Sequence, residues 1–139
     1  MKTLTMILCC LLCAMAHAAS PRSSYGKVDN AALWVSPISL IAAPSKYDGK
    51  AVRVIGAFSM AFEGQELCVH KEDLLQGLEK NCLWIEPNLN VLGASRNTLS
   101  ELNGKYVLVE GTFEQDNHGH FGLFSGAITG IWRVMLWRR

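Results

Sequence analysis

The sequence predicts a mainly β fold in which five strands form a small closed barrel. One pattern occurs twice, 55 residues apart, in residues 48–58 (DGKAVRVIGAF) and 103–113 (NGKYVLVEGTF). Both copies alternate, so that two valines, a glycine and a phenylalanine share one face of a strand. The glycine inside each copy, Gly56 or Gly111, is typical of a bulge or bend. Bent strands with matching faces are what a small barrel needs at its corners.

Length and composition fit one such domain. The chain has 139 residues, half of them apolar and 18% charged. This composition excludes intrinsic disorder, because the apolar surface can offset the entropy lost on folding. A chain of this length has room for a single core.

The first eighteen residues are typical of a cleaved export signal. Lys2 provides a positive start, a short apolar stretch follows, and Ala16-His17-Ala18 matches the cleavage pattern A-x-A. We therefore expect a mature protein that begins at Ala19 and is periplasmic or secreted. The apolar stretch is shorter than the roughly 20 residues of a membrane-crossing helix, and no later segment qualifies, so no transmembrane span is expected.

The domain is expected to cover residues 33–139, after a flexible lead-in of small and polar residues over 19–32. Its first element is an N-terminal helix, because Ser36 can cap it and Pro37 suits its first position. Pro44 ends this helix early.

The remaining elements follow from alternation and turn residues. Glu63-Gly64 predicts a hairpin after the first strand, and the leucine spacing of residues 71–80 predicts a short helix or helical loop. Thr98 and Glu101 form a candidate capping box for a helix before the fourth strand. A turn is expected over residues 116–119. The expected strands after the first are 65–70, 81–86, 103–113 and 121–134.

This order, a helix, three strands, a short helix and two strands, resembles the OB-fold, a five-stranded Greek-key barrel with a helix between strands three and four. More particularly, the chain resembles small exported bacterial OB-fold proteins of undefined activity. The resemblance covers residues 35–134 and depends on the two repeated segments. It implies a ligand-binding face across strands two and three, between the loops that join strands one to two and four to five. On this chain that face comprises Glu63, Gln65, Glu66, His70, Trp84 and Glu86, with the two histidines at 118 and 120.

Two cysteines remain after cleavage, Cys68 and Cys82, on strands expected to be antiparallel neighbours. If Leu67 and Leu83 face the core, both cysteines face outward, so a disulfide between them is one interpretation. An oxidising compartment favours it. The alternative is two partly buried thiols whose register does not match. No C-x-x-C motif indicates a redox catalyst.

Asp116, His118 and His120 are candidate metal ligands. Residues two apart project from one face of an extended strand, and imidazole with carboxylate suits zinc or copper. The alternative is a solvated hairpin tip without metal. No other cofactor is expected.

These features favour an exported, non-enzymatic binding domain for a protein, peptide or small ligand of the cell envelope. Removing Lys2 leaves 12 basic residues against 12 acidic ones, so the mature chain lacks the basic field that attracts nucleic acid. One alternative is a metal-binding protein that uses the His-Gly-His hairpin. Another is a small hydrolase with an unrecognised site, since the common catalytic motifs are absent and Glu63 and Glu66 are typical of a solvated hairpin tip.

The C-terminal tail, residues 131–139, mixes tryptophans with arginines. One interpretation is the end of the last strand. The other is weak contact with a membrane surface, because tryptophan favours the interface and arginine favours anionic headgroups.

Overall fold

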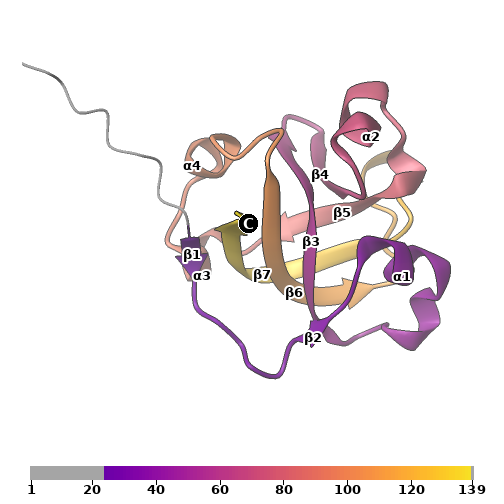
Figure 1. Ribbon diagram of the computed structural model, residues 1–139, viewed down its shortest axis with the longest axis horizontal. Coiled ribbons are helices and arrows are strands. Elements are labelled where there is room, and N and C mark those ends of the chain that lie inside the picture. The colour runs from indigo at the N-terminus through magenta and orange to yellow at the C-terminus, as the bar shows by residue number, and fades with distance from the viewer. Residues whose placement is uncertain (1–23, 139) are drawn as a thin grey trace, which may run out of the picture.

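The computed structural model describes residues 24–138 (Figure 1). The expected signal, residues 1–18, and residues 19–23 of the expected lead-in lie outside the described part. Within it the strands are β1 (Ser24–Gly26), β2 (Leu33–Trp34), β3 (Ala51–Ala61), β4 (Gly64–Cys68), β5 (Cys82–Pro87), β6 (Tyr106–Glu114) and β7 (Ala127–Leu136). The helices are α1 (Pro37–Ala42), α2 (Lys71–Gln76), α3 (Leu89–Leu92) and α4 (Arg96–Ser100), with 3-10 turns η1 (Pro44–Lys46), η2 (Glu79–Asn81) and η3 (His120–Gly122).

The prediction of a mainly β fold is confirmed, and the five longest strands pair in a closed circuit. β3 pairs with β4, and β4 with β5, both antiparallel. β5 then pairs with β7 in parallel. β7 pairs with β6, and β6 returns to β3, both antiparallel. Figure 1 shows these strands curving around a common centre, with α1 and α2 on one side and α3 and α4 on the other.

The repeated segments form β3 and β6, and their alternation places the expected residues in the core. Val52 and Val54 of β3 are fully buried, as are Val107 and Val109 of β6. Phe58 and Phe113 join them in the main apolar cluster. The sequence period of two therefore decides which face of each strand points inward.

The two strand glycines serve different purposes. The register between β6 and β7 shifts between Glu110 and Thr112, so Gly111 occupies the expected irregularity. β3 and β6 keep a regular register at Gly56. A Cβ at Gly56 would lie 2.7 Å from the carbonyl oxygen of Cys68, which shows that this glycine permits close approach of β4.

The expectation of five strands was incomplete, because two short strands, β1 and β2, precede α1. β1 pairs with β7, and β2 pairs in parallel with β3. Tyr25 of β1 is buried in the main cluster, which gives this segment an apolar anchor. Tyr25 and Ala32 of residues 24–32 are buried, whereas most other side chains of this segment are exposed.

Helix placement also differs in part from the prediction. α1 begins as expected, with Ser36 Oγ accepting a hydrogen bond from the Ser39 amide. Between β5 and β6, however, the chain forms two helices, α3 and α4, rather than one. The cap of α4 is Ser95, which accepts from the Thr98 amide, so the expected capping box at Thr98 was wrong by one turn.

The last strand begins later than predicted. β7 starts at Ala127 rather than at Phe121, because left-handed backbone interrupts the preceding residues. Gly119, Phe121 and Gly122 have φ of 60°, 54° and 69°. These dihedrals differ from those of an extended strand, and three of them within residues 119–122 prevent a strand from forming there. The connection from β6 to β7 is instead an irregular loop, residues 115–126, that contains η3.

Candidate functional site

The β3–β4 hairpin loop and the β6–β7 loop meet at one place. The hairpin loop consists of Phe62 and Glu63. Glu63 Oε1 lies 3.9 Å from Nε2 of His120, the residue that begins η3. Phe121 follows His120 directly. We call the surface formed by Phe62, Glu63, His120 and Phe121 the loop face.

Each loop carries an exposed phenylalanine. Phe62 precedes a residue with a strained backbone, and Phe121 itself has a strained backbone. Phe62 is 90% exposed and Phe121 is 80% exposed. Glu63 (φ 60°) and Phe121 (φ 54°) are the two non-glycine residues with positive φ in the described chain. The left-handed conformation costs a residue with a Cβ about 1–2 kcal/mol. Strain of this kind persists where surrounding structure fixes it, and it concentrates at functional sites.

Relief of this strain is a testable consequence. We expect Glu63→Gly and Phe121→Gly each to raise the free energy of unfolding by about 1 kcal/mol, because glycine adopts positive φ without the Cβ clash. Denaturant titration of each variant against the parent chain measures this difference. Ser45→Gly, at an exposed residue of η1, is the comparison. A loss of stability in both loop variants would contradict the assignment of strain.

Internal contacts fix the conformation of the β6–β7 loop. His118 Nδ1 lies 3.0 Å from the carbonyl oxygen of Phe124, so these two residues close the loop. Gly119 packs flat on Trp84, where an added Cβ would lie 2.4 Å from the indole. The His120 ring then stacks over Trp84 at a centroid distance of 6.4 Å. These contacts hold the loop against Trp84, with His120 Nε2 3.9 Å from Glu63 Oε1.

The structure brings together part of the face that the resemblance implied. Glu66 and Trp84 lie opposite each other on β4 and β5. Trp84 Nε1 donates to Glu86 Oε1 at 3.0 Å. Trp84 is nevertheless buried, because Phe124 and His120 of the β6–β7 loop cover it. This part of the face is therefore occupied by the chain itself.

Two other residues of the implied face lie elsewhere. Gln65 alternates with Glu66 along β4, and its Oε1 accepts from Arg96 of α4 at 2.9 Å. His70 precedes α2 and is exposed, and its backbone N–H donates to Asp73 at 2.8 Å. Neither side chain joins the loop face.

Cys68 and Cys82 form the disulfide that the sequence left open. They are direct partners in the β4–β5 register, with Cα atoms 4.0 Å apart. Their side chains point away from the main core, as expected. They are nevertheless fully buried, because a second apolar cluster with Trp84 and Phe124 covers the outer side of these strands.

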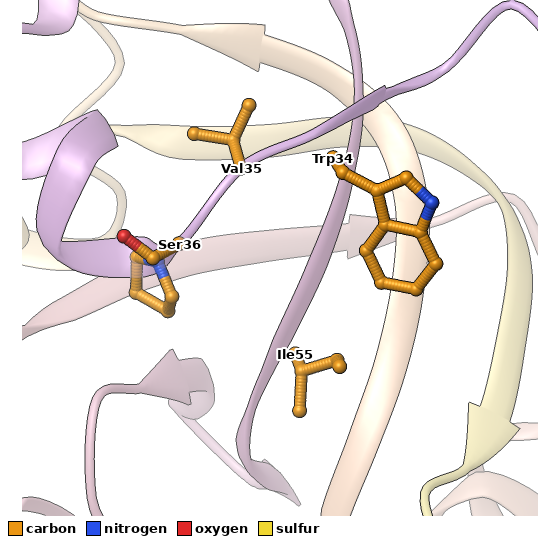
Figure 2. Close-up of a pocket in the computed structure, with 5 residues that line it drawn as sticks. Trp34, Val35, Ser36 and Ile55 are labelled. Carbon is orange, nitrogen blue, oxygen red and sulfur yellow. The ribbon is translucent and has the colours of Figure 1, made fainter.

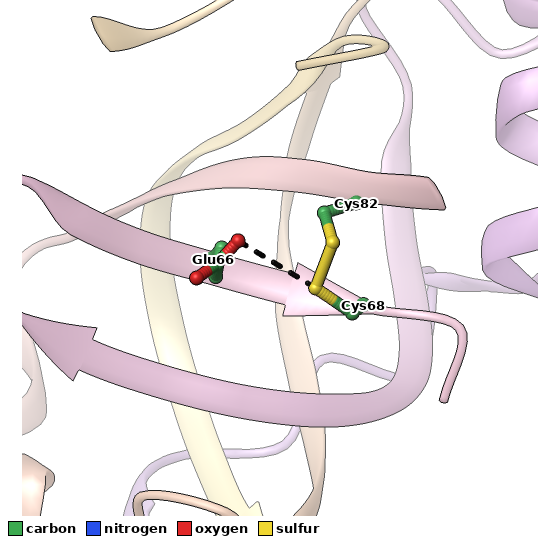
Figure 3. Close-up of side chains that lie close together, drawn as sticks. All are labelled: Glu66, Cys68 and Cys82. Atoms are coloured by element: carbon green, nitrogen blue, oxygen red, sulfur yellow. Dashed lines mark hydrogen bonds between the residues drawn. A yellow bond between two sulfur atoms is a disulfide. The ribbon is translucent and has the colours of Figure 1, made fainter. Parts of the chain in front are cut away.

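The carboxyl group of Glu66 lies beside this disulfide. Its Oε2 is 3.6 Å from Cys68 Sγ (Figure 3). Burial, together with the nearby negative charge of Glu79, raises the pKa of Glu66. A bridged sulfur carries no hydrogen, so only the protonated carboxyl group can donate in this contact.

The raised pKa of Glu66 predicts that the stability of the fold depends on pH. The folded chain binds the Glu66 proton more tightly than the unfolded chain, so ionisation costs stability as the pH rises above the usual carboxyl range. We expect Glu66→Gln to raise the thermal midpoint at pH 7, and the gain to vanish at a pH where the carboxyl group is protonated in both states. Calorimetry at several pH values tests this, with exposed Glu101→Gln as the control. A gain independent of pH would contradict the role of ionisation.

The metal-ligand prediction is not matched by a shared geometry. His118 turns to the carbonyl of Phe124, whereas His120 lies over Trp84. The extended backbone that would align them with Asp116 is broken at Gly119. Among residues 24–138, the three-residue group with converging ligand atoms is Glu66, Cys68 and Cys82, whose two sulfurs are joined in the disulfide.

Sequence reasoning missed a buried carboxylate at the centre of the outer sheet surface. Glu110 Oε1 accepts from Arg53 at 2.7 Å and from Arg133 at 2.8 Å. Its Oε2 accepts from the Asp29 amide at 2.9 Å and from Trp132 Nε1 at 3.2 Å. The signal available in the sequence was a single acidic residue, Glu110, directly after the apolar run of residues 106–109.

The Glu110 cluster also holds part of the C-terminal tail, residues 131–139. Trp132 and Arg133, which the membrane interpretation requires to be free, are held by Glu110. Most of the tail is the end of β7, and Trp137 and Arg138 after it are exposed. No helix in the described residues is both long and apolar enough to span a bilayer.

Comparison with known proteins adds no relative to this description. No family model, curated protein or solved structure was found to match the chain.

Proposed function

We propose that the chain is an exported, non-enzymatic binding domain that contacts an envelope protein or peptide through the loop face. The observation that carries this proposal is the pair of exposed rings, Phe62 and Phe121, on two loops that meet at Glu63 and His120. Buried aromatic anchors dominate the energy of many protein interfaces. Holding them rigid before binding reduces the entropy lost on association.

The arrangement of the strands supports an OB-fold as the scaffold. The circuit β3–β4–β5–β7–β6 contains the parallel pair β5–β7 and four antiparallel pairs. The loops that meet join the first two and the last two strands of this circuit, which are the loops beside the ligand face of OB-folds. The buried disulfide supports an oxidising, exported location.

The shape of the loop face favours a macromolecular partner. Both phenylalanines are largely exposed, whereas Trp84 is buried under His120 and Phe124 of the β6–β7 loop. Projecting rings fit apolar pockets on a partner rather than enclosing a small ligand. Glu63, where the two loops meet, adds an exposed carboxylate to this surface.

A pull-down from envelope extract tests the proposal, with the mature chain as bait. We expect the parent chain to retain a defined partner and the double variant Phe62→Ser/Phe121→Ser to lose it. Leu75→Ser is the matched control, because Leu75 is also a large exposed apolar residue but lies on α2. Equal retention by all three chains, or retention by none, would reject the loop face as the binding surface.

A further inference from the structure

A second surface, which shares no residue with the loop face, contains a pocket at the edge of β3. The pocket has a volume of about 330 Å³ and is lined by Trp34, Val35, Ser36, Pro37 and Ile55. In Figure 2 the Trp34 indole and the Ile55 side chain border the same opening, with Val35 and Ser36 across from Trp34. Most of this lining is apolar.

Trp34 is exposed but held in place. It is 59% exposed. The edge of the Trp137 ring approaches it at a centroid distance of 6.4 Å. The Arg53 guanidinium group lies 5.0 Å from the centre of the indole. A side chain fixed in this way can form one wall of a binding site without losing much further entropy.

The edge of β3 at this pocket has no partner strand. On this side of β3, β2 pairs as far as Arg53, and β4 pairs from Ala57 onward. Within the described chain, Ile55 is paired only with Leu108 of β6, on the other side. The interval from Arg53 to Ala57 is roughly 13 Å long, enough for about three residues of an extended chain.

The backbone N–H and C=O groups of successive β3 residues point to alternate sides of the strand, and those of Ile55 point into this interval. Phe58 exchanges hydrogen bonds with the β6 side, through Lys105 and Gly104. The Arg53 carbonyl instead accepts from Val35, on the β2 side. Because hydrogen-bonding direction alternates along a strand, the N–H and C=O of Ile55 point the same way as those of Arg53, towards the interval.

We propose that this surface binds an extended peptide segment that pairs with Ile55 and inserts an apolar side chain beside Trp34. Main-chain pairing gives such a segment its affinity, and the pocket gives it specificity. An anionic membrane would suit Trp34 and Arg138 but has no alternating donors and acceptors to pair with a strand edge. The unpaired backbone therefore favours a peptide.

Amide hydrogen exchange, measured by NMR on the mature chain, tests the strand edge without a ligand. We expect the Ile55 amide to exchange at least about 100-fold faster than the Val54 amide, which faces β6. Equal protection of the two amides would overturn the proposal, because the edge would already be paired.

Selection from a phage-displayed library of random dodecapeptides tests the occupant. We expect enriched peptides to protect the Ile55 amide and to bind Trp34→Ala at least about tenfold more weakly. Phe121→Gly and Leu75→Ala should bind them as the parent does, which separates this surface from the loop face. N-methylation of the peptide residue opposite Ile55 should also cost about tenfold and leaves the protein unchanged.

Three further results would also overturn the proposal. The first is failure to enrich any peptide. The second is affinity that survives both Trp34→Ala and peptide N-methylation. The third is that the chain binds phosphatidylglycerol vesicles through Trp34 while no peptide protects the Ile55 amide from exchange. That result would assign the surface to a membrane.

Discussion

Glu110→Ala is expected to lower the free energy of unfolding by about 3–5 kcal/mol, the cost of removing one partner from a buried ion pair. Glu110 is fully buried. Its loss would leave Arg53 and Arg133 near each other without the carboxylate that holds both. It would also leave the Asp29 amide without its acceptor, and so loosen the segment between β1 and β2.

The pH dependence of stability has a definite sign. Burial alone would raise the pKa of Glu110, but hydrogen bonds from the Asp29 amide and from Arg133, Arg53 and Trp132 outweigh it and hold the pKa below its ordinary value. A lowered folded-state pKa contributes stability that is fully present above the ordinary carboxyl value and is lost as the pH falls through the folded value. The parent chain should therefore lose this contribution in acid.

Urea titrations of the parent chain, Glu110→Ala and Glu110→Gln between pH 3 and pH 7 measure both effects. We expect the difference between the parent chain and Glu110→Gln to be largest at pH 7 and to shrink towards pH 3. Glu101→Gln, at an exposed carboxyl group, should track the parent throughout. A Glu110→Gln variant as stable as the parent at pH 7 would show that the cluster contributes no net stability.

Reduction of the disulfide is expected to lower the free energy of unfolding by about 3 kcal/mol, the chain-entropy value for a loop of roughly 15 residues. The bridge joins Cys68 and Cys82, 14 positions apart. It fixes β4 against β5 beneath the second apolar cluster, where Trp84 supports the β6–β7 loop. Loss of the disulfide should therefore also loosen the loop face.

Denaturant titration with and without dithiothreitol measures this contribution. The parent chain should shift to lower stability in the reductant, whereas Cys68→Ala/Cys82→Ala should be equally stable in both conditions. The Phe121 amide should exchange faster in the reduced parent chain if the bridge supports the loop. An unchanged parent chain in reductant, with the bridge shown to be open, would contradict the assignment.

The parts of the fold that could be predicted are those encoded by local alternation. Alternating valines indicate which face of each strand is buried. They are Val52 and Val54 in β3 and Val107 and Val109 in β6. The pairing that closes the circuit, β5 with β7 in parallel, depends on contacts between distant segments and has no local pattern. For the same reason, burial of Tyr25 under β7 could not be read from a polar lead-in.

Two members of the loop face were among the residues singled out in the sequence, and the other two were not. Resemblance directed attention to Glu63 and His120, which do meet. It did not indicate Phe62 or Phe121, because the neighbouring sequence does not distinguish an exposed phenylalanine from a buried one. The sequence predicted a hairpin at Glu63-Gly64, and Glu63 rather than Gly64 adopts the positive φ. Tertiary contacts of the two loops outweigh local preference there.

Photo-crosslinking in living cells tests the central claim, that the loop face is a binding surface, most directly. Benzoylphenylalanine would replace Phe62, Phe121 or, as the control, Leu75 of α2, which is also exposed. We expect one discrete crosslinked product that is shared by positions 62 and 121 and absent at position 75. Products that are absent at both loop positions, or identical at all three, would contradict it.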